Sequence, residues 1–147
     1  MEDITITNCY STGNISSSSS YANCGGIAGE VVTGNANTIN NCAAINPAIK
    51  STGTYAYAGR IVGNISGSLT ISNNFALNTM IATDKAFNTD MAYHGVDKID
   101  AQLRTQITYS GAINGDGLGG LGWKFGNDDA NPWKMPDGGG YPILYWQ

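Results

Sequence analysis

Aromatic side chains near the C-terminal end are the clearest candidates for ligand chemistry in this sequence. The three tryptophans of the 147-residue chain are Trp123, Trp133 and Trp146, and Tyr141 lies among them. Flat rings with a polar tip could stack on sugar rings and so form a carbohydrate-binding platform. The same rings could instead fill the apolar core of a terminal unit. We favour this second interpretation, because large aromatics close an exposed core efficiently.

Catalytic groups are sparse along the chain, in which only 12% of residues are charged. A polysaccharide-cleaving enzyme needs paired carboxylates, or a carboxylate with a basic partner, on one face. Within the repeats of residues 4–82 the candidates are only the well-separated Glu30, Lys50 and Arg60. Asp128 and Asp129 form a pair within a Gly/Asn-rich turn, where we expect a solvated loop. The sequence therefore predicts no catalytic residues, and we do not expect an enzyme.

The sequence also lacks the residue spacings typical of metal sites and of redox-active cysteine pairs. His94 is the one histidine, and the three cysteines Cys9, Cys24 and Cys42 have no CxxC spacing. An odd number of cysteines argues against a closed disulfide framework, although Cys9 and Cys42 could reach disulfide distance if they were stacked. The Gly/Asp-rich segment 114–120 lacks the full calcium-loop pattern. We expect no metal site and no cofactor, and the oxidation state of Cys9 and Cys42 stays open.

Composition and charge exclude several classes of protein. Gly, Asn, Thr and Ser make up about two-fifths of the chain, which is typical of a turn-rich, mostly β protein. Seven Lys and Arg against eleven Asp and Glu leave no basic stripe for nucleic acid. No apolar run is long enough to span a membrane. The first residues do not resemble a signal peptide, and we expect a parent protein to carry one.

A repeat of about 33 residues organises the first half of the chain. Segments Ile6–Ile15, Ile39–Ile49 and Ile71–Ile81 align, with first residues spaced by 33 and 32. A second signature lies between them, because Gly25–Val31 matches Gly59–Ile65 at a spacing of 34. Two signatures in a fixed order at a near-constant period indicate stacked repeats.

Stacking these repeats predicts an all-β fold, namely a parallel, right-handed β-helix or solenoid with about two and a half coils. Asn8, Asn41 and Asn73 would form a ladder at one corner. The rival fold is an antiparallel β-sandwich, which requires no two-signature repeat. The expected strands are Ile4–Ser11, Gly26–Val32, Thr38–Ile45, Ala56–Ile65 and Leu69–Leu77, with shorter ones near Ile15, Ile49 and Ile81.

Two ladders of equivalent residues would build the core of that fold. Cys9 would stack on Cys42 and then on Asn74, and Ile27 would stack on Ile61. No single repeat could bury these side chains alone, whereas neighbouring repeats could bury them together. We therefore predict structural rather than chemical roles for all five residues.

Residues 83–147 differ in composition, and we predict that they cap the repeats of residues 4–82. A solenoid needs an atypical terminal unit to cover the open end of its core. Asp100 is a plausible N-cap for a short helix over 101–106, with Leu103 and Ile107 on one face. Segments Trp133–Pro136 and Tyr141–Trp146 read as a hairpin across a Gly-rich turn.

The Gly-x-aliphatic-x-Gly segments Gly25–Gly29 and Gly59–Gly63 resemble the GLUG motif of large bacterial surface proteins, many from gut Bacteroides. The aromatic pattern of the last 40 or so residues is similar to the end of such arrays. Arg60 of the second segment stands where the first has Gly26, and the third repeat lacks the motif altogether. The resemblance implies an extracellular, adhesin-like repeat protein and supplies no catalytic residues. The C-terminal pattern consists of Tyr109, Gly122–Phe125, Trp133–Met135 and Tyr141–Trp146.

These observations predict a non-catalytic, secreted or cell-surface repeat module with a structural or interaction role. Its expected partners are surface glycans or proteins of a host or of bacteria, and its first strand could pair with preceding repeats or a second copy. One alternative is a carbohydrate-binding module that uses the C-terminal aromatics. A second, less favoured alternative is a polysaccharide-cleaving β-helix enzyme.

Overall fold

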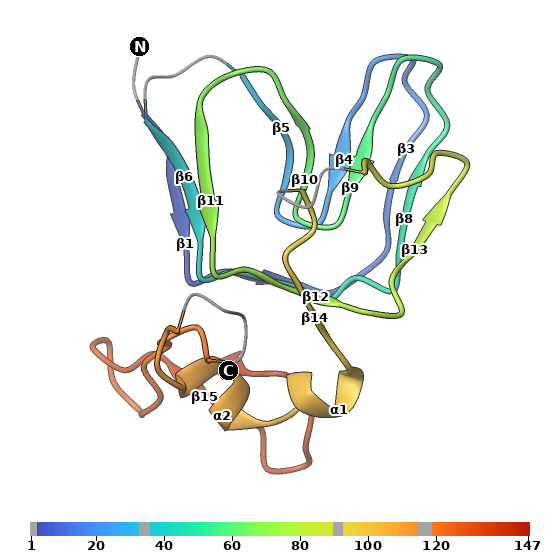
Figure 1. The fold of residues 1–147 in the computed structure, drawn as a ribbon. Coiled ribbons are helices and arrows are strands. Elements are labelled where there is room, and N and C mark those ends of the chain that lie inside the picture. The colour runs from blue at the N-terminus through green and yellow to red at the C-terminus, as the bar shows by residue number, and fades with distance from the viewer. Residues whose placement is uncertain (1–2, 33–35, 90–92, 115–118) are drawn as a thin grey trace.

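The computed structural model describes residues 3–32, 36–89, 93–114 and 119–147, and these are mostly strand with two short helices (Figure 1). The predicted β-rich class with parallel sheets is confirmed. The strands preceding the helices are β1 (Thr5–Thr7), β2 (Tyr10–Ser11), β3 (Ile15–Ser17), β4 (Cys24–Gly25), β5 (Ala28–Val31), β6 (Asn37–Asn40), β7 (Ala43–Ala44), β8 (Ala48–Ser51), β9 (Ala58–Gly59), β10 (Val62–Ile65), β11 (Leu69–Ser72), β12 (Phe75–Leu77), β13 (Ile81–Thr83) and β14 (Val96–Lys98).

Each of the five sheets in this part of the chain pairs strands from successive repeats in parallel. Their orders are β1-β6-β11, β14-β12-β7-β2, β13-β8-β3, β4-β9 and β5-β10. Ile6 pairs with Ile39, which pairs with Ile71 on its other side. The sequence spacings of 33 and 32 are therefore the register of a sheet, and the rival antiparallel sandwich is wrong for these residues.

Short walls joined by sharp corners make up each repeat. In Figure 1 the sheets of β1 and β3 face each other, the sheet of β2 joins them, and β4, β5, β9 and β10 fold into the space between. Several strands predicted as single are each split in two, as Ile4–Ser11 is into β1 and β2. The break falls at Asn8, Asn41 and Asn73, whose φ angles are 55°, 54° and 50°. Asparagine tolerates this left-handed conformation, which turns the chain by too much for one strand to continue.

The inward fold of the second signature explains its glycines. A Cβ on Gly63 would lie 2.5 Å from the carbonyl oxygen of Gly29 and 2.7 Å from the backbone nitrogen of Cys24. A Cβ on Gly26 would lie 2.7 Å from that of Ala44, which faces the inward turn from the adjoining wall. The chain can therefore fold into its own interior only where side chains are absent.

Strand β14 pairs with β12 and continues the sheet at the end of the stack, whereas the C-terminal region after β14 lies against the side of the stacked repeats (Figure 1). It comprises α1 (Asp100–Leu103), α2 (Gln106–Ser110) and an antiparallel hairpin of β15 (Trp133–Lys134) and β16 (Ile143–Leu144), and Figure 1 places it below the sheet of β12 and β14. The predicted hairpin is confirmed. Of the predicted capping region 83–147, β14 and Phe87 lie on the last repeat, and the helices and hairpin lie beside the stack (Figure 1). No helix in the described ranges is both long and apolar enough to cross a membrane.

The predicted single helix is in fact two short ones. The N-cap of α1 is Ile99 rather than Asp100, and the helix ends at Leu103 before Arg104 and Thr105. Leu103 is buried, whereas Ile107 is 72% exposed. The break rotates Ile107 away from the face that Leu103 shares with the core, so the expected pairing of these two residues is wrong.

We expect Gly63→Ala to lower the free energy of unfolding by about 2 to 3 kcal/mol, because the added methyl group meets backbone atoms that cannot move aside. Gly13→Ala is the matched control, since a Cβ there has no atom within 4 Å. Urea unfolding followed by circular dichroism measures both. A Gly63→Ala protein as stable as the control would contradict the close approach of β5 and β10.

Candidate functional site

Two of the predicted sugar-stacking residues are enclosed in the core. The side chains of Trp123 and Trp133 are 2% and 8% exposed, and their rings stack with centroids 4.3 Å apart. Tyr109, also fully buried, packs 4.8 Å from Trp123, and its hydroxyl donates a hydrogen bond to the carbonyl oxygen of Leu103 at 2.6 Å. Burial raises the pKa of the Tyr109 hydroxyl. Neither tryptophan offers a free face to a sugar in this structure.

This aromatic cluster fastens the C-terminal region to the repeats. Trp123 Nε1–H donates a hydrogen bond of 2.7 Å to the backbone oxygen of Asn41, at the corner of the second repeat. Tyr10 of the first repeat packs 6.2 Å from Trp123 and 5.7 Å from Trp133. The tryptophans therefore cover the outer face of the β2-β7-β12 sheet, which is an apolar role related to the predicted cap but in a different place.

The other two predicted residues lie nearer the surface and have separate partners. The Tyr141 hydroxyl donates to Asp100 Oδ1 at 2.5 Å, and the Arg104 guanidinium lies 4.6 Å from the Tyr141 ring centre. Hydrogen bonds from Arg104 and then from Tyr141 lower the pKa of the Asp100 carboxyl. Trp146 is 62% exposed and meets Tyr145 edge-on at 5.0 Å. Among the described residues, only Trp123 and Trp133 of the four predicted rings stack on one another.

The structure places the predicted core ladders in neighbouring repeats. Asn74 Oδ1 accepts a hydrogen bond from the backbone nitrogen of Cys42 at 2.9 Å, and its amide donates to the carbonyl oxygen of Ile39 at 2.9 Å. Cys9 and Cys42 hold equivalent positions, joined through the bond from the Ala43 nitrogen to the Cys9 oxygen. An amide thus replaces the thiol in the third repeat and satisfies backbone groups of the second.

The second ladder joins Ile27 to Ile61. The Ile61 oxygen accepts hydrogen bonds from the backbone nitrogens of Ile27 and Ala28 at 3.0 and 3.1 Å. Ile61 is fully buried, while Ile27 in the first repeat is only partly buried. The difference arises because Ile61 has a neighbour on both sides: its own nitrogen donates to the Tyr93 oxygen.

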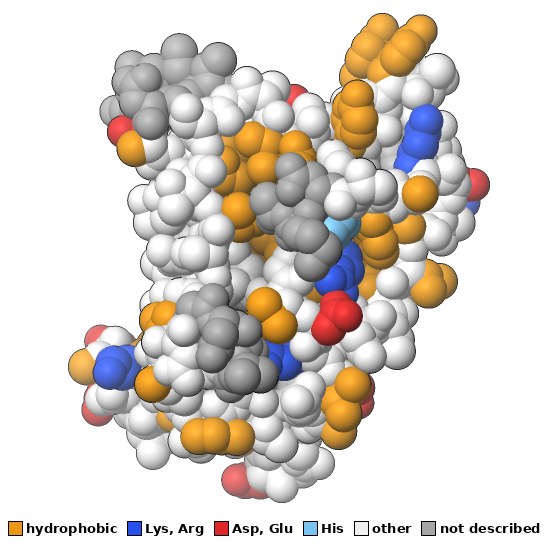
Figure 2. Space-filling model, viewed as in Figure 1, with side chains coloured by type: hydrophobic (Ala, Val, Ile, Leu, Met, Phe, Trp, Pro, Cys, Tyr) orange, Lys and Arg blue, Asp and Glu red, His pale blue; other side chains and the backbone are white. Residues whose placement is uncertain are grey.

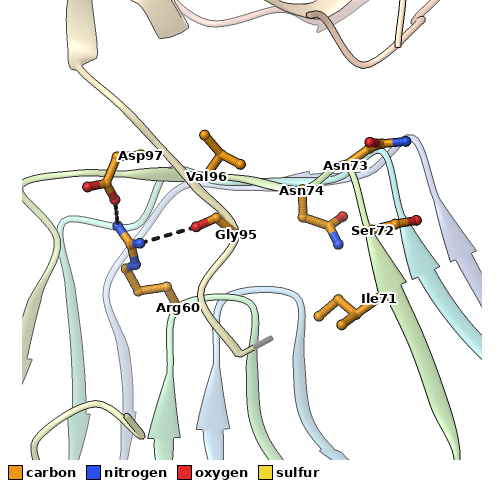
Figure 3. Close-up of a pocket in the computed structure, with 8 residues that line it drawn as sticks. All are labelled: Arg60, Ile71, Ser72, Asn73, Asn74, Gly95, Val96 and Asp97. Atoms are coloured by element: carbon orange, nitrogen blue, oxygen red, sulfur yellow. Dashed lines mark hydrogen bonds and ion pairs between the residues drawn. The ribbon is translucent and has the colours of Figure 1, made fainter. Parts of the chain in front are cut away.

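A cleft of about 480 Å³ opens beside the last strand of the β1-β6-β11 sheet (Figure 3). Arg60, which stands where the first segment has Gly26, donates hydrogen bonds to Asp97 Oδ1 at 2.5 Å and to the Gly95 oxygen at 3.3 Å. The guanidinium thus has structural partners. The cleft is lined by Arg60, Ile71, Ser72, Asn73, Asn74, Gly95, Val96 and Asp97.

The remaining ionisable candidates also have structural contacts. Asp128 Oδ1 accepts hydrogen bonds from the backbone and side chain of Asn131, and Asp129 accepts one from the Tyr145 hydroxyl at 2.7 Å. His94 is buried, contacts the Asn88 oxygen and meets the Phe87 ring edge-on. Within the described ranges no three His, Cys, Asp or Glu residues gather as metal ligands would. Most of the calcium-loop candidate, residues 115–118, lies outside those ranges.

A group of exposed tyrosines is not among the site residues predicted from the sequence. Tyr21, Tyr55 and Tyr57 are 71%, 62% and 52% exposed, on the loops that join β3 to β4 and β8 to β9. The rings of Tyr21 and Tyr55 stack with centroids 5.1 Å apart and planes 15° from parallel. Their separation of 34 residues, which matches the repeat, was the signal that could have identified them.

Replacing the buried tryptophans tests whether their role is structural. We expect Trp133→Ala to cost about 3 to 5 kcal/mol of unfolding free energy, because it empties a large buried site. Trp146→Ala, the exposed control, should change stability by less than about 0.5 kcal/mol. Urea denaturation monitored by far-ultraviolet circular dichroism distinguishes them. Equal losses in the two variants would show that the core does not enclose Trp133.

Thiol labelling tests the placement of the free cysteines. Burial raises the pKa of the Cys42 thiol to about 12 and raises that of Cys24, whereas Cys9 is exposed. At pH 8 we expect iodoacetamide to label Cys9 rapidly in the native protein and the other two only in urea, because the thiolate is the reactive form. Mass spectrometry of the peptides, with Cys9→Ser as control, measures this. Rapid labelling of Cys42 would contradict its burial between repeats.

The described residues therefore form an enclosed aromatic cluster, a cleft beside the Arg60–Asp97 ion pair, and an exposed pair of stacked tyrosines. Comparisons of the sequence with protein-family models and with curated proteins, and a comparison with solved structures, each found no match.

Proposed function

We propose that the chain is a parallel, right-handed β-solenoid of about two and a half coils that acts as a non-catalytic interaction module on a bacterial surface or after secretion. The observation that supports this is the pairing of equivalent residues across successive repeats. Thr38 lies between Thr5 and Thr70, and Ala44 between Ser11 and Ala76. Stacked repeats of this kind give rigid, extended surfaces, which suit binding better than turnover.

The charged side chains of the repeats support a structural role. Lys50 lies 3.5 Å from Asp84, and Glu30 accepts a hydrogen bond from the Asn64 amide at 2.9 Å. Each pair is separated by 34 residues and so joins one repeat to the next. Exposed pairs of this kind contribute little stability individually. Their geometry ties neighbouring repeats together and does not direct two carboxylates towards one substrate.

Carbohydrate binding through the C-terminal aromatics is the second candidate function. It is favoured by Trp146, whose ring is exposed and held edge-on by Tyr145. Because Trp123 and Trp133 are buried, such a site would depend on Trp146 and its neighbours alone. The resemblance to GLUG repeats supports an extracellular location for either function.

We expect the purified chain to bind at least one of immobilised mucin, pectin, cellulose or collagen saturably and to release no reducing ends or peptides from it. Biolayer interferometry measures the binding, and a reducing-sugar assay with peptide mass spectrometry measures turnover. Heat-unfolded protein is the control for non-specific adhesion. Release of products would contradict the non-catalytic role, and binding to none of the four would contradict the interaction role.

A further inference from the structure

Two exposed tyrosines, Tyr21 of the first repeat and Tyr55 of the second, stack on one another in a row, to which the described residues of the third repeat add no further ring. Tyr21 and Tyr55 each precede by three positions the residues that pair between β4 and β9, Cys24 and Ala58. They therefore occupy equivalent places in the first and second repeats. Their stacking in the exposed loops gives Tyr55 a fixed orientation, because one of its faces is covered by Tyr21.

The third repeat cannot continue the row, because its loop is shorter. Ile49 pairs with Ala82, and Ala58 forms a parallel bridge with Phe87. The chain thus takes nine residues from Ile49 to Ala58 but only five between their third-repeat equivalents. The residue three positions before Phe87 is Asp84, which has a φ of 71° in this tight connection. Within the described ranges, no aromatic ring of the third repeat stacks on Tyr55.

A hollow of about 280 Å³ occurs where the next ring would lie. Lys85 stands at its edge and donates one of its ammonium hydrogens to the Thr54 oxygen at 2.9 Å. An ammonium group has three hydrogens to donate, so it can also bond to a ligand. Figure 2 shows hydrophobic side chains projecting at this end of the molecule beside a basic one. The hollow is lined by Thr54, Tyr55, Ala56, Tyr57, Lys85, Ala86 and Asn88.

We propose that this hollow binds one pyranose ring of a glycan, stacked on the face of Tyr55 opposite Tyr21. A pyranose presents weakly positive C–H groups to the negative face of an aromatic ring, while its hydroxyls lie around its rim. Lys85 and the hydroxyl of Tyr57 stand at that rim and can bond to them. This inference rests on the interaction role proposed above and names its ligand class.

Polar surroundings favour a sugar over a purely apolar ring in this hollow. Thr54 and the serine run of 16–20 give the loops a surface rich in hydroxyl groups. The side chain of a proline or phenylalanine would stack on Tyr55 but would leave the Lys85 ammonium without a bond from the ligand. The site therefore differs from the C-terminal aromatic platform in position.

Titration with defined oligosaccharides tests the proposal. Cello-, xylo- and galacturono-hexaoses and neutral mucin-type oligosaccharides are added to the protein, and binding is followed by isothermal calorimetry and by shifts of tyrosine ring resonances. We expect at least one to bind and Tyr55→Ala to weaken it about tenfold or more. Tyr55→Phe should keep the affinity within about threefold, because the ring face stays. Lys85→Met, which keeps the aliphatic stem, should weaken binding about threefold to tenfold.

Matched controls keep the outcome interpretable. Tyr55 is exposed, so its alanine variant should unfold at the same urea concentration as the parent, and Ile107→Ala, at an exposed position of α2, should bind sugar normally. The proposal is overturned if no oligosaccharide binds, if Tyr55→Ala binds as well as the parent, or if Trp146→Ala alone abolishes binding. It is also overturned if a proline-rich peptide binds the hollow and the sugars do not. Retained binding of Tyr55→Ala to an immobilised polymer would reject this site and leave the interaction role intact.

Discussion

Hydrogen bonds between the backbones of successive repeats are the constraint on which the rest of this structure depends. A parallel sheet built from one residue of each repeat places equivalent side chains directly above one another. Each side chain in the sheet must therefore pack against the equivalent side chains of the neighbouring repeats. The wall facing the inward fold meets this requirement with Ser11, Ala44 and Ala76, which pair in register and leave space for the glycine-lined turn. Small residues at one position thus permit close backbone approach at another.

The outer face of the same wall carries apolar side chains that must be covered. Tyr10, Ala43 and Phe75 alternate with the small residues and point outwards, where Ala43 and Phe75 are almost fully buried. Such a face cannot remain in water, and the C-terminal aromatic cluster covers it. Trp123 and Trp133 are thereby explained as packing, and the rings available to a partner are exposed ones such as Trp146 and the tyrosines of the loops.

Periodicity made the register of the sheets predictable, because a 33-residue spacing of Ile6 and Ile39 appears in the sequence itself. The corners were harder to predict, since Asn8 and its equivalents turn the chain through a backbone conformation that hydrophobic patterning does not reveal. The side-on position of the C-terminal region depends on contacts such as Trp123 with Asn41, which are 82 residues apart. Hydrophobic patterning does not identify Tyr55, because exposed residues leave no periodic apolar signal. Its spacing of 34 residues from Tyr21 does match the length of the repeat.

The side-on aromatic cluster also has a consequence for the order of folding. A simple array of repeats can begin to fold as soon as two neighbours exist, since each repeat contacts only the adjacent ones. Here Tyr10 near the beginning of the chain packs against Trp133 near its end. The first repeat therefore lacks part of its packing until Trp133 has left the ribosome. Contacts of such long sequence separation slow folding, and here the residues around Trp133 complete the packing of the first repeat.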